Sequence, residues 1–182
     1  MARRAVFLDR DGVVNEAVVR QGKPYPPQSA DQLRLVRGAS EAFARLHERG
    51  LSLIVVTNQP DVARGTSSRE AVESIHAALA GMLPLDDFFV CYHDDEDRCP
   101  CRKPKPGLLL NAAARHGILL GESFLIGDRW RDIDAAHAAG CLGIFLDYSY
   151  LERRPTRDPD ATVTSLTAAA DWILARLPDG HE

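Results

Sequence analysis

The sequence lacks the features that would place it in a membrane or on nucleic acid. No apolar run approaches the roughly 20 residues that a helix needs to cross a bilayer. Only Ala5 to Leu8 are apolar before Asp9, which is too short for the core of a signal peptide. No run of Lys and Arg is long enough to follow a phosphate backbone, and the net charge is −4. We therefore expect a cytoplasmic protein that binds neither membranes nor nucleic acid.

Cysteine is also scarce, with four residues in a chain of 182. In a cytoplasmic protein we expect these thiols to be reduced or bound to metal rather than paired in disulfides. The length suits one α/β domain over residues 1–182, without an insertion large enough for a cap domain. We expect a monomer, and we find no internal repeat or low-complexity tract.

Two carboxylates one residue apart close the first apolar segment, in Val6-Phe-Leu-Asp-Arg-Asp-Gly-Val-Val-Asn15. If residues 6–8 form a strand, Asp9 and Asp11 converge where the strand ends and the chain curls. Carboxylates that close repel each other unless a cation lies between them, and Mg²⁺ prefers such ligands together with water and phosphate oxygens. The motif predicts phosphoryl chemistry; the alternative is a pair of exposed turn aspartates.

Apolar segments with polar ends recur along the chain and alternate with helical patterns. We predict further strands at residues 51–56, 86–92, 123–127 and 142–147, helices at 38–49, 106–116, 133–139 and 166–177, and a loop at 16–35. A capping box at Ser67 to Glu70 starts a further helix with Val72, Ile75, Leu79 and Met82 on its apolar face, which we interpret as purely structural. This alternation predicts an α/β fold with a mostly parallel sheet.

Three cysteines and one histidine fall within one short segment: Cys91, His93, Cys99 and Cys101. Four such ligands with no position left open predict a closed, structural zinc site, and the alternative is free thiols with a surface histidine. Cys141 is interpreted as a lone free thiol. The zinc would hold the following basic loop, with Arg102 and Lys103, beside the phosphate site.

The motifs together resemble the haloacid dehalogenase superfamily of aspartate-nucleophile phosphatases, which has a Rossmann-like fold. The resemblance implies that Asp9 attacks phosphorus and that Asp11 protonates the leaving oxygen and later activates water. Thr57-Asn58-Gln59 resembles the second motif, with Thr57 and Asn58 at the phosphate; the alternative is that Thr57 merely caps the next segment. Lys103 matches the third motif. Gly127-Asp128 resembles the fourth, with Asp128 as a Mg²⁺ ligand beside Asp9 and Asp11, and Asp132 would orient the site.

Cys-x-His, Cys-x-Cys and Arg-Lys-Pro together resemble the subgroup with D-glycero-D-manno-heptose 1,7-bisphosphate phosphatase and the histidinol-phosphate phosphatase domain. The resemblance implies removal of the C7 phosphate of the heptose bisphosphate. Arg64 and Arg102 have no assigned partner and would bind the second phosphate of that sugar. Alternatives are histidinol phosphate, another sugar phosphate, or a catalytically silent zinc-binding module.

Overall fold

The computed structural model describes residues 3–178. A six-stranded parallel sheet with the order β5-β4-β1-β6-β7-β8 forms its centre. The strands are β1 (Ala5–Leu8), β4 (Ser52–Asn58), β5 (Asp87–Cys91), β6 (Phe124–Gly127), β7 (Leu142–Leu146) and β8 (Ala161–Val163). The predicted α/β class is confirmed, and residues 3–178 contain no separate cap domain.

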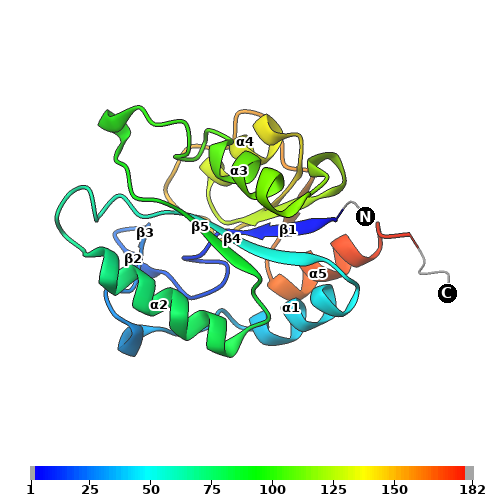
Figure 1. Cartoon of the computed structure of the whole chain (residues 1–182), viewed down its shortest axis with the longest axis horizontal. Coiled ribbons are helices and arrows are strands. Elements are labelled where there is room, and N and C mark those ends of the chain that lie inside the picture. Colours follow the sequence, from blue (N-terminus) through cyan, green and yellow to red (C-terminus); the bar gives the residue numbers. More distant parts are fainter. Residues whose placement is uncertain (1–2, 179–182) are drawn as a thin grey trace.

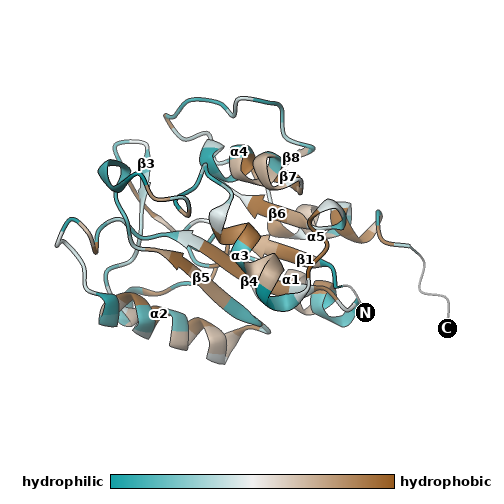
Figure 2. Ribbon diagram, turned by 45° about the horizontal axis from the view of Figure 1, so that its top comes forward, coloured by the Kyte–Doolittle hydropathy of each residue, from teal (hydrophilic) through white to brown (hydrophobic). Residues whose placement is uncertain are grey.

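Helices cover both faces of the sheet (Figure 1). Helices α3 (Gly107–His116) and α4 (Trp130–Ala139) lie on one face, and α1 (Ala39–Glu48), α2 (Arg69–Met82) and α5 (Leu166–Leu174) lie on the other. Successive side chains of a strand point to opposite faces. Accordingly Ala5 and Phe7 enter one hydrophobic cluster while Val6 and Leu8 enter the other. Because both faces are covered, the central strands are continuous apolar runs (Figure 2).

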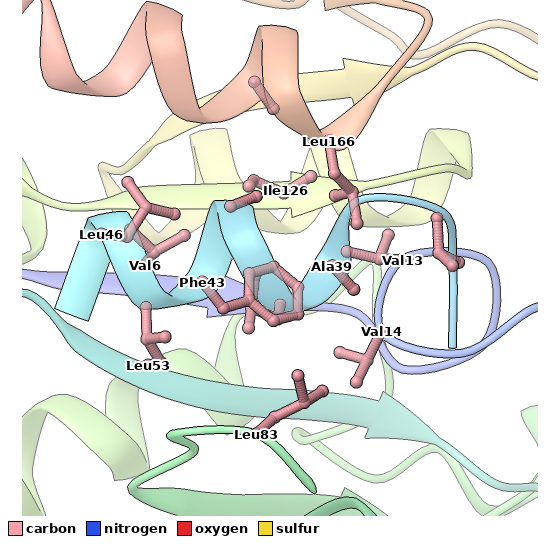
Figure 3. Packing of buried hydrophobic residues seen from close by; sticks show 14 of the residues in the cluster. Val6, Val13, Val14, Ala39, Phe43, Leu46, Leu53, Leu83, Ile126 and Leu166 are labelled. Atoms are coloured by element: carbon pink, nitrogen blue, oxygen red, sulfur yellow. The ribbon is translucent and has the colours of Figure 1, made fainter. Parts of the chain in front are cut away.

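The larger cluster shows how an amphipathic helix is fixed on the sheet. Phe43 of α1 is fully buried beside residues of β1, β4 and α5, among them Val6, Leu53 and Leu166 (Figure 3). Full burial of one such side chain stabilises the fold by about 1.5–3 kcal/mol. This packing holds α1 against the sheet and leaves its polar face to solvent.

Several predicted boundaries are corrected. The segment predicted as a loop at residues 16–35 contains an antiparallel hairpin, β2 (Val18–Arg20) with β3 (Lys23–Tyr25), and a short 3₁₀ turn. Strands of three residues are too short to show a period, and Pro24 is tolerated because the hairpin is a two-stranded ribbon. Strand β8, three residues long, was predicted as loop for the same reason.

The helix ends also differ from prediction. Ser68, not Ser67, caps α2, and its side chain accepts a hydrogen bond from the Ala71 backbone N–H at 3.1 Å. Met82 at the end of α2 is 58% exposed, so it lies outside the apolar face. Helix α4 begins three residues earlier than predicted, at Trp130, and α5 ends at Leu174 rather than at residue 177. Within the described residues, no helix has both the length and the apolar character to span a bilayer.

Candidate active site

The predicted site residues meet where the order of the sheet reverses. Strand β1 lies between β4 and β6, and Asp9, Thr57 and Asp128 stand at the carboxyl ends of these three strands. In open α/β sheets, ligands bind at such a switch point. The fold therefore brings together side chains that are far apart in the sequence.

A buried lysine organises the acidic groups. The Nζ of Lys103 donates to Asp9 Oδ1 at 2.7 Å, to Asp132 Oδ1 at 2.6 Å and to the Val56 carbonyl at 2.7 Å. Its side chain is only 2% exposed. Burial by itself lowers the pKa of Lys103, but the charges of Asp132 and Asp9 outweigh it and raise the pKa. Lys103 is therefore a permanent cation beside Asp9.

The carboxylates of Asp9, Asp128 and Asp132 approach one another so that one oxygen of each lies within 4.8 Å of the others. Both side-chain oxygens of Asp128 are buried without a hydrogen-bond partner in the described part of the chain. Burial, reinforced by the charge of Asp132, raises the pKa of Asp9 to about 6, and burial and the charge of Asp9 raise that of Asp128 well above its usual range. A divalent cation at Asp9 and Asp128 would offset the repulsion between these carboxylates and give the oxygens of Asp128 a partner, so these two donors fit Mg²⁺. Asp132 instead accepts hydrogen bonds from Lys103 Nζ and the Arg129 backbone N–H.

The turn after β1 allows this approach. Gly12 has φ +100°, and a Cβ on it would lie 1.9 Å from Asp128 Oδ2. Gly127 is equally constrained, because a Cβ there would lie 2.1 Å from the Cβ of Asp132. Gly12 thus makes room for the carboxylate of Asp128, and Gly127 for the side chain of Asp132.

Asp11 is close to this group, but its carboxylate is held by other side chains. Arg10 donates to Asp11 through Nε at 3.1 Å and through Nη2 at 3.0 Å. The side-chain amides of Asn15 and Gln59 also donate to Asp11, at 3.0 and 2.8 Å. Asp11 is not among the three carboxylates that approach one another, so its assignment as a metal ligand stays a prediction. The sequence interpretation gave no role to Arg10, Asn15 or Gln59; only their positions inside recognised motifs could have indicated one.

Thr57 and Asn58 play different structural parts. The hydroxyl of Thr57 accepts a hydrogen bond from Gln59 at 2.9 Å and lines the cavity above the carboxylates. Asn58 also lines this cavity, but its amide pairs at 3.0 Å with both the N–H and the carbonyl of Lys103. Asn58 therefore fixes the backbone that carries Lys103 over the site.

The cavity has a volume of 280 Å³ and reaches Asp9, Asp11, Thr57 and Lys103. Its wall includes Lys23 to Pro26 of the β2–β3 hairpin, so the segment predicted to border the site does so. Arg129 and Arg131, which the sequence interpretation did not select, also line it. Arg129 is paired with Glu152. A mostly cationic rim above buried carboxylates suits an anionic ligand.

Arg64 and Arg102 line the cavity as predicted, but the expectation that they lack partners is wrong. Arg64 forms two hydrogen bonds with Asp94, at 2.6 and 2.7 Å, and Arg102 pairs with Asp95 at 2.9 Å. Both aspartates belong to the segment between Cys91 and Cys99. The sequence alone could not pair them, because the partner of Arg64 lies 30 residues away and depends on how that segment folds.

The four predicted zinc ligands do converge. Their sulfur and nitrogen atoms lie within 4.8 Å of one another, and the three Sγ–Sγ distances are 3.2, 3.4 and 3.6 Å. A tetrahedral zinc with Zn–S bonds near 2.3 Å has ligand separations of about 3.8 Å. Cys91, His93, Cys99 and Cys101 therefore fit a closed tetrahedral metal site. Cys141 is not part of this group; it is buried in the apolar cluster that also includes Cys91 and Leu109.

Three comparisons with known proteins agree with this geometry. The family model described as haloacid dehalogenase-like hydrolase matches residues 25–140. A D-glycero-D-manno-heptose-1,7-bisphosphate 7-phosphatase from Thermosynechococcus vestitus is 34% identical, with 97% of this chain and 98% of the relative aligned. A D-glycero-beta-D-manno-heptose-1,7-bisphosphate 7-phosphatase from Vibrio cholerae is 38% identical over 77% of this chain and 78% of the relative.

A solved structure extends the likeness to three dimensions. The D,D-heptose 1,7-bisphosphate phosphatase from B. bronchiseptica, complexed with magnesium and phosphate, superposes with a TM-score of 0.82 at 30% identity. The match covers 96% of this chain and 99% of that one. A HAD-like phosphatase from Mesorhizobium loti gives a TM-score of 0.74 at 27% identity, covering 96% and 85% of the two chains.

Proposed function

The chain belongs to the haloacid dehalogenase-like hydrolases, and we propose that it is a Mg²⁺-dependent phosphatase that removes the C7 phosphate of D-glycero-D-manno-heptose 1,7-bisphosphate. The observation that carries the proposal is the position of Asp9, which lines the cavity at the sheet switch point between Lys103 and Asp128. The names and full-length alignment of the relatives support the choice of sugar. The complete site argues against a catalytically silent module.

In the proposed reaction, Asp9 and Asp11 have the roles that the resemblance to the family implies. A carboxylate oxygen of Asp9 attacks phosphorus while the bond from phosphorus to the C7 oxygen breaks, and protonated Asp11 gives its proton to that oxygen. Asp11, now ionised, takes a proton from water as the water oxygen attacks phosphorus, which releases phosphate and restores Asp9. Lys103 offsets negative charge throughout. Asp9 and Asp128, with Asp11 as the further predicted ligand, would hold Mg²⁺, which would neutralise negative charge on the phosphoryl group.

We propose that Cys91, His93, Cys99 and Cys101 hold a structural Zn²⁺. The four donors leave no open position for chemistry. Directly after Cys101, the chain enters the active-site cavity with Arg102 and Lys103, so a metal at this point would limit the motion of both cations. The segment between Cys91 and Cys101 contains no buried apolar residue that would serve the same purpose.

Binding of a second phosphate requires Arg64 and Arg102 to exchange their aspartate partners for it. Both pairs are open to solvent on at least one side, because the side chain of Arg64 is 45% exposed and that of Asp95 is 58% exposed, so water screens the attraction within each pair. A phosphate dianion carries more charge than one carboxylate and competes for the same donors. We propose that the distal phosphate of the sugar binds at these two arginines.

The same ion pairs favour one second candidate. Because Asp94 and Asp95 offset the charges of Arg64 and Arg102, the entrance repels the ammonium group of histidinol phosphate less than two unpaired arginines would. Initial rates on heptose 1,7-bisphosphate, histidinol phosphate and simple sugar monophosphates separate the two. We expect the highest kcat/KM for the heptose bisphosphate; a higher value for histidinol phosphate would overturn the proposed substrate.

Two variants test the assignment of roles. Asp9→Asn removes the nucleophile, so we expect substrate binding without turnover, whereas Asp31→Asn on the surface should behave as the wild type. Arg102→Ala should raise KM for the bisphosphate and change KM for a sugar monophosphate little, with Arg98→Ala on the same segment as the matched control. Normal turnover by Asp9→Asn, or equal KM changes for both substrates, would contradict the respective assignment.

A further inference from the structure

Arg10, which separates the two catalytic aspartates in the sequence, is fully buried. Its Nε and Nη2 each donate to one oxygen of Asp11, at 3.1 and 3.0 Å, in the parallel two-point geometry that guanidinium and carboxylate favour. A contact of this kind fixes both the position and the rotation of the carboxylate. Asn15 and Gln59 each add a single hydrogen bond to the same group.

The third donor group of Arg10 points at helix α2. Its Nη1 lies 3.2 Å from Nε2 of His76, which is 7% exposed and stacks on Phe88 with ring centroids 4.7 Å apart. A guanidinium has donors only, so Nε2 of His76 accepts this hydrogen bond and the ring proton is on Nδ1. Burial and the charge of Arg10 lower the pKa of His76 to about 4, which keeps the ring neutral at neutral pH. Helix α2, which its sequence pattern indicated to be purely structural, thus places a side chain against Arg10.

We propose that Arg10 and His76 are positioning residues, with His76 orienting the Arg10 guanidinium so that Arg10 aligns the Asp11 carboxylate for proton transfer to the leaving oxygen. This inference rests on the role proposed for Asp11. A buried guanidinium without an acceptor for Nη1 has an unsatisfied charged donor, which is costly, so it rotates toward another acceptor. Asp11 then keeps only its single hydrogen bonds to Asn15 and Gln59, and the direction of its proton is no longer defined.

The consequence depends on the leaving group. An alkoxide from a sugar phosphate needs a proton as its bond to phosphorus breaks, whereas p-nitrophenolate departs without one. A misaligned Asp11 therefore slows the first chemical step for the sugar ester and spares that step for the nitrophenyl ester. A general loosening of the site slows both.

The test compares first-turnover rates of leaving-group release from heptose 1,7-bisphosphate and p-nitrophenyl phosphate by rapid quench and stopped flow. His76→Phe keeps the stacking on Phe88 but removes the acceptor. We expect its rate on the sugar ester to fall about 10- to 100-fold with KM nearly unchanged, and its rate on the nitrophenyl ester to fall less than about threefold. His76→Gln, which retains an acceptor, should recover most of the loss, and His47→Phe on the surface of α1 is the control.

Arg10→Lys provides a second reading if His76→Phe folds poorly, because it keeps the charge and loses the two-point contact; it should show the same selective loss. Equal losses on both esters, or none, would overturn the inference. Asp11→Asn separates this result from a failure of the proposed mechanism. If Asp11→Asn does not selectively slow the sugar ester, the role of Asp11 is wrong; if it does and neither other variant does, only the positioning role is wrong.

Discussion

Replacing Lys103 by Met tests whether this lysine holds the carboxylate group together. The side chain is 2% exposed and its Nζ lies 2.7 Å from Asp9 and 2.6 Å from Asp132. Loss of one partner of a buried ion pair costs about 3–5 kcal/mol. Because Lys103 serves two carboxylates, we expect the upper part of this range, about 4–5 kcal/mol at pH 8 without Mg²⁺.

The loss of stability caused by Lys103→Met should be smaller at lower pH. The folded-state pKa of Asp9, about 6, lies above its ordinary value of 3.8, so the folded protein takes up this proton before the unfolded chain does as the pH falls. Proton uptake by the folded state raises the free energy of unfolding. Without Lys103 the pKa of Asp9 rises further, so the variant gains more than the wild type. At pH 5 we expect the free energy of unfolding of Lys103→Met to be about 2–3 kcal/mol below that of the wild type, because protonation of Asp9 already weakens its ion pair with Lys103 in the wild type.

Urea unfolding at pH 8 and pH 5 measures this difference, in Mg²⁺-free buffer without chelator so that the proposed zinc is retained. The corresponding decrease in Tm at pH 8 is about 10–15 °C for a chain of this length. Lys23→Met, at an exposed lysine on the hairpin, is the matched control and should change stability by less than about 0.5 kcal/mol. A Lys103→Met protein as stable as the wild type at pH 8 would refute the reasoning.

Three further predictions follow from the same structure. Mg²⁺ must displace the proton of Asp9, whose pKa is about 6, and that of Asp128, whose pKa is also raised, so calorimetric Mg²⁺ affinity should fall by at least roughly tenfold per pH unit below pH 6; an affinity independent of pH would contradict the assigned ligands. Elemental analysis should find about one zinc per chain, and Cys99→Ser should lose it and melt at a lower temperature, whereas Cys141→Ser should retain it. Removal of the α2 cap in Ser68→Ala should lower the free energy of unfolding by about 1 kcal/mol, and Ser67→Ala should have little effect, a ranking that reverses if Ser67 is the cap.

The sequence by itself determined the fold class and which polar residues follow the central strands. Buried parallel strands are continuous apolar runs, and the first polar residues after them, such as Asp9 and Asp128, must lie at the common carboxyl end of the sheet. The convergence of Cys91, His93, Cys99 and Cys101 was also predictable, because three cysteines and a histidine within one short segment are typical of a closed metal site. Short-range spacing carries this kind of information directly.

Only the tertiary structure decided which partner each charged group has. Arg64 meets Asp94, and Lys103 meets Asp9 from 94 residues away, because a particular packing of loops brings them together. His76 reads in the sequence as one more residue beside the apolar face of α2, yet packing α2 under β5 places it against Arg10. The three-residue strands of the hairpin likewise have too little pattern of their own, and contacts between distant segments decide their conformation.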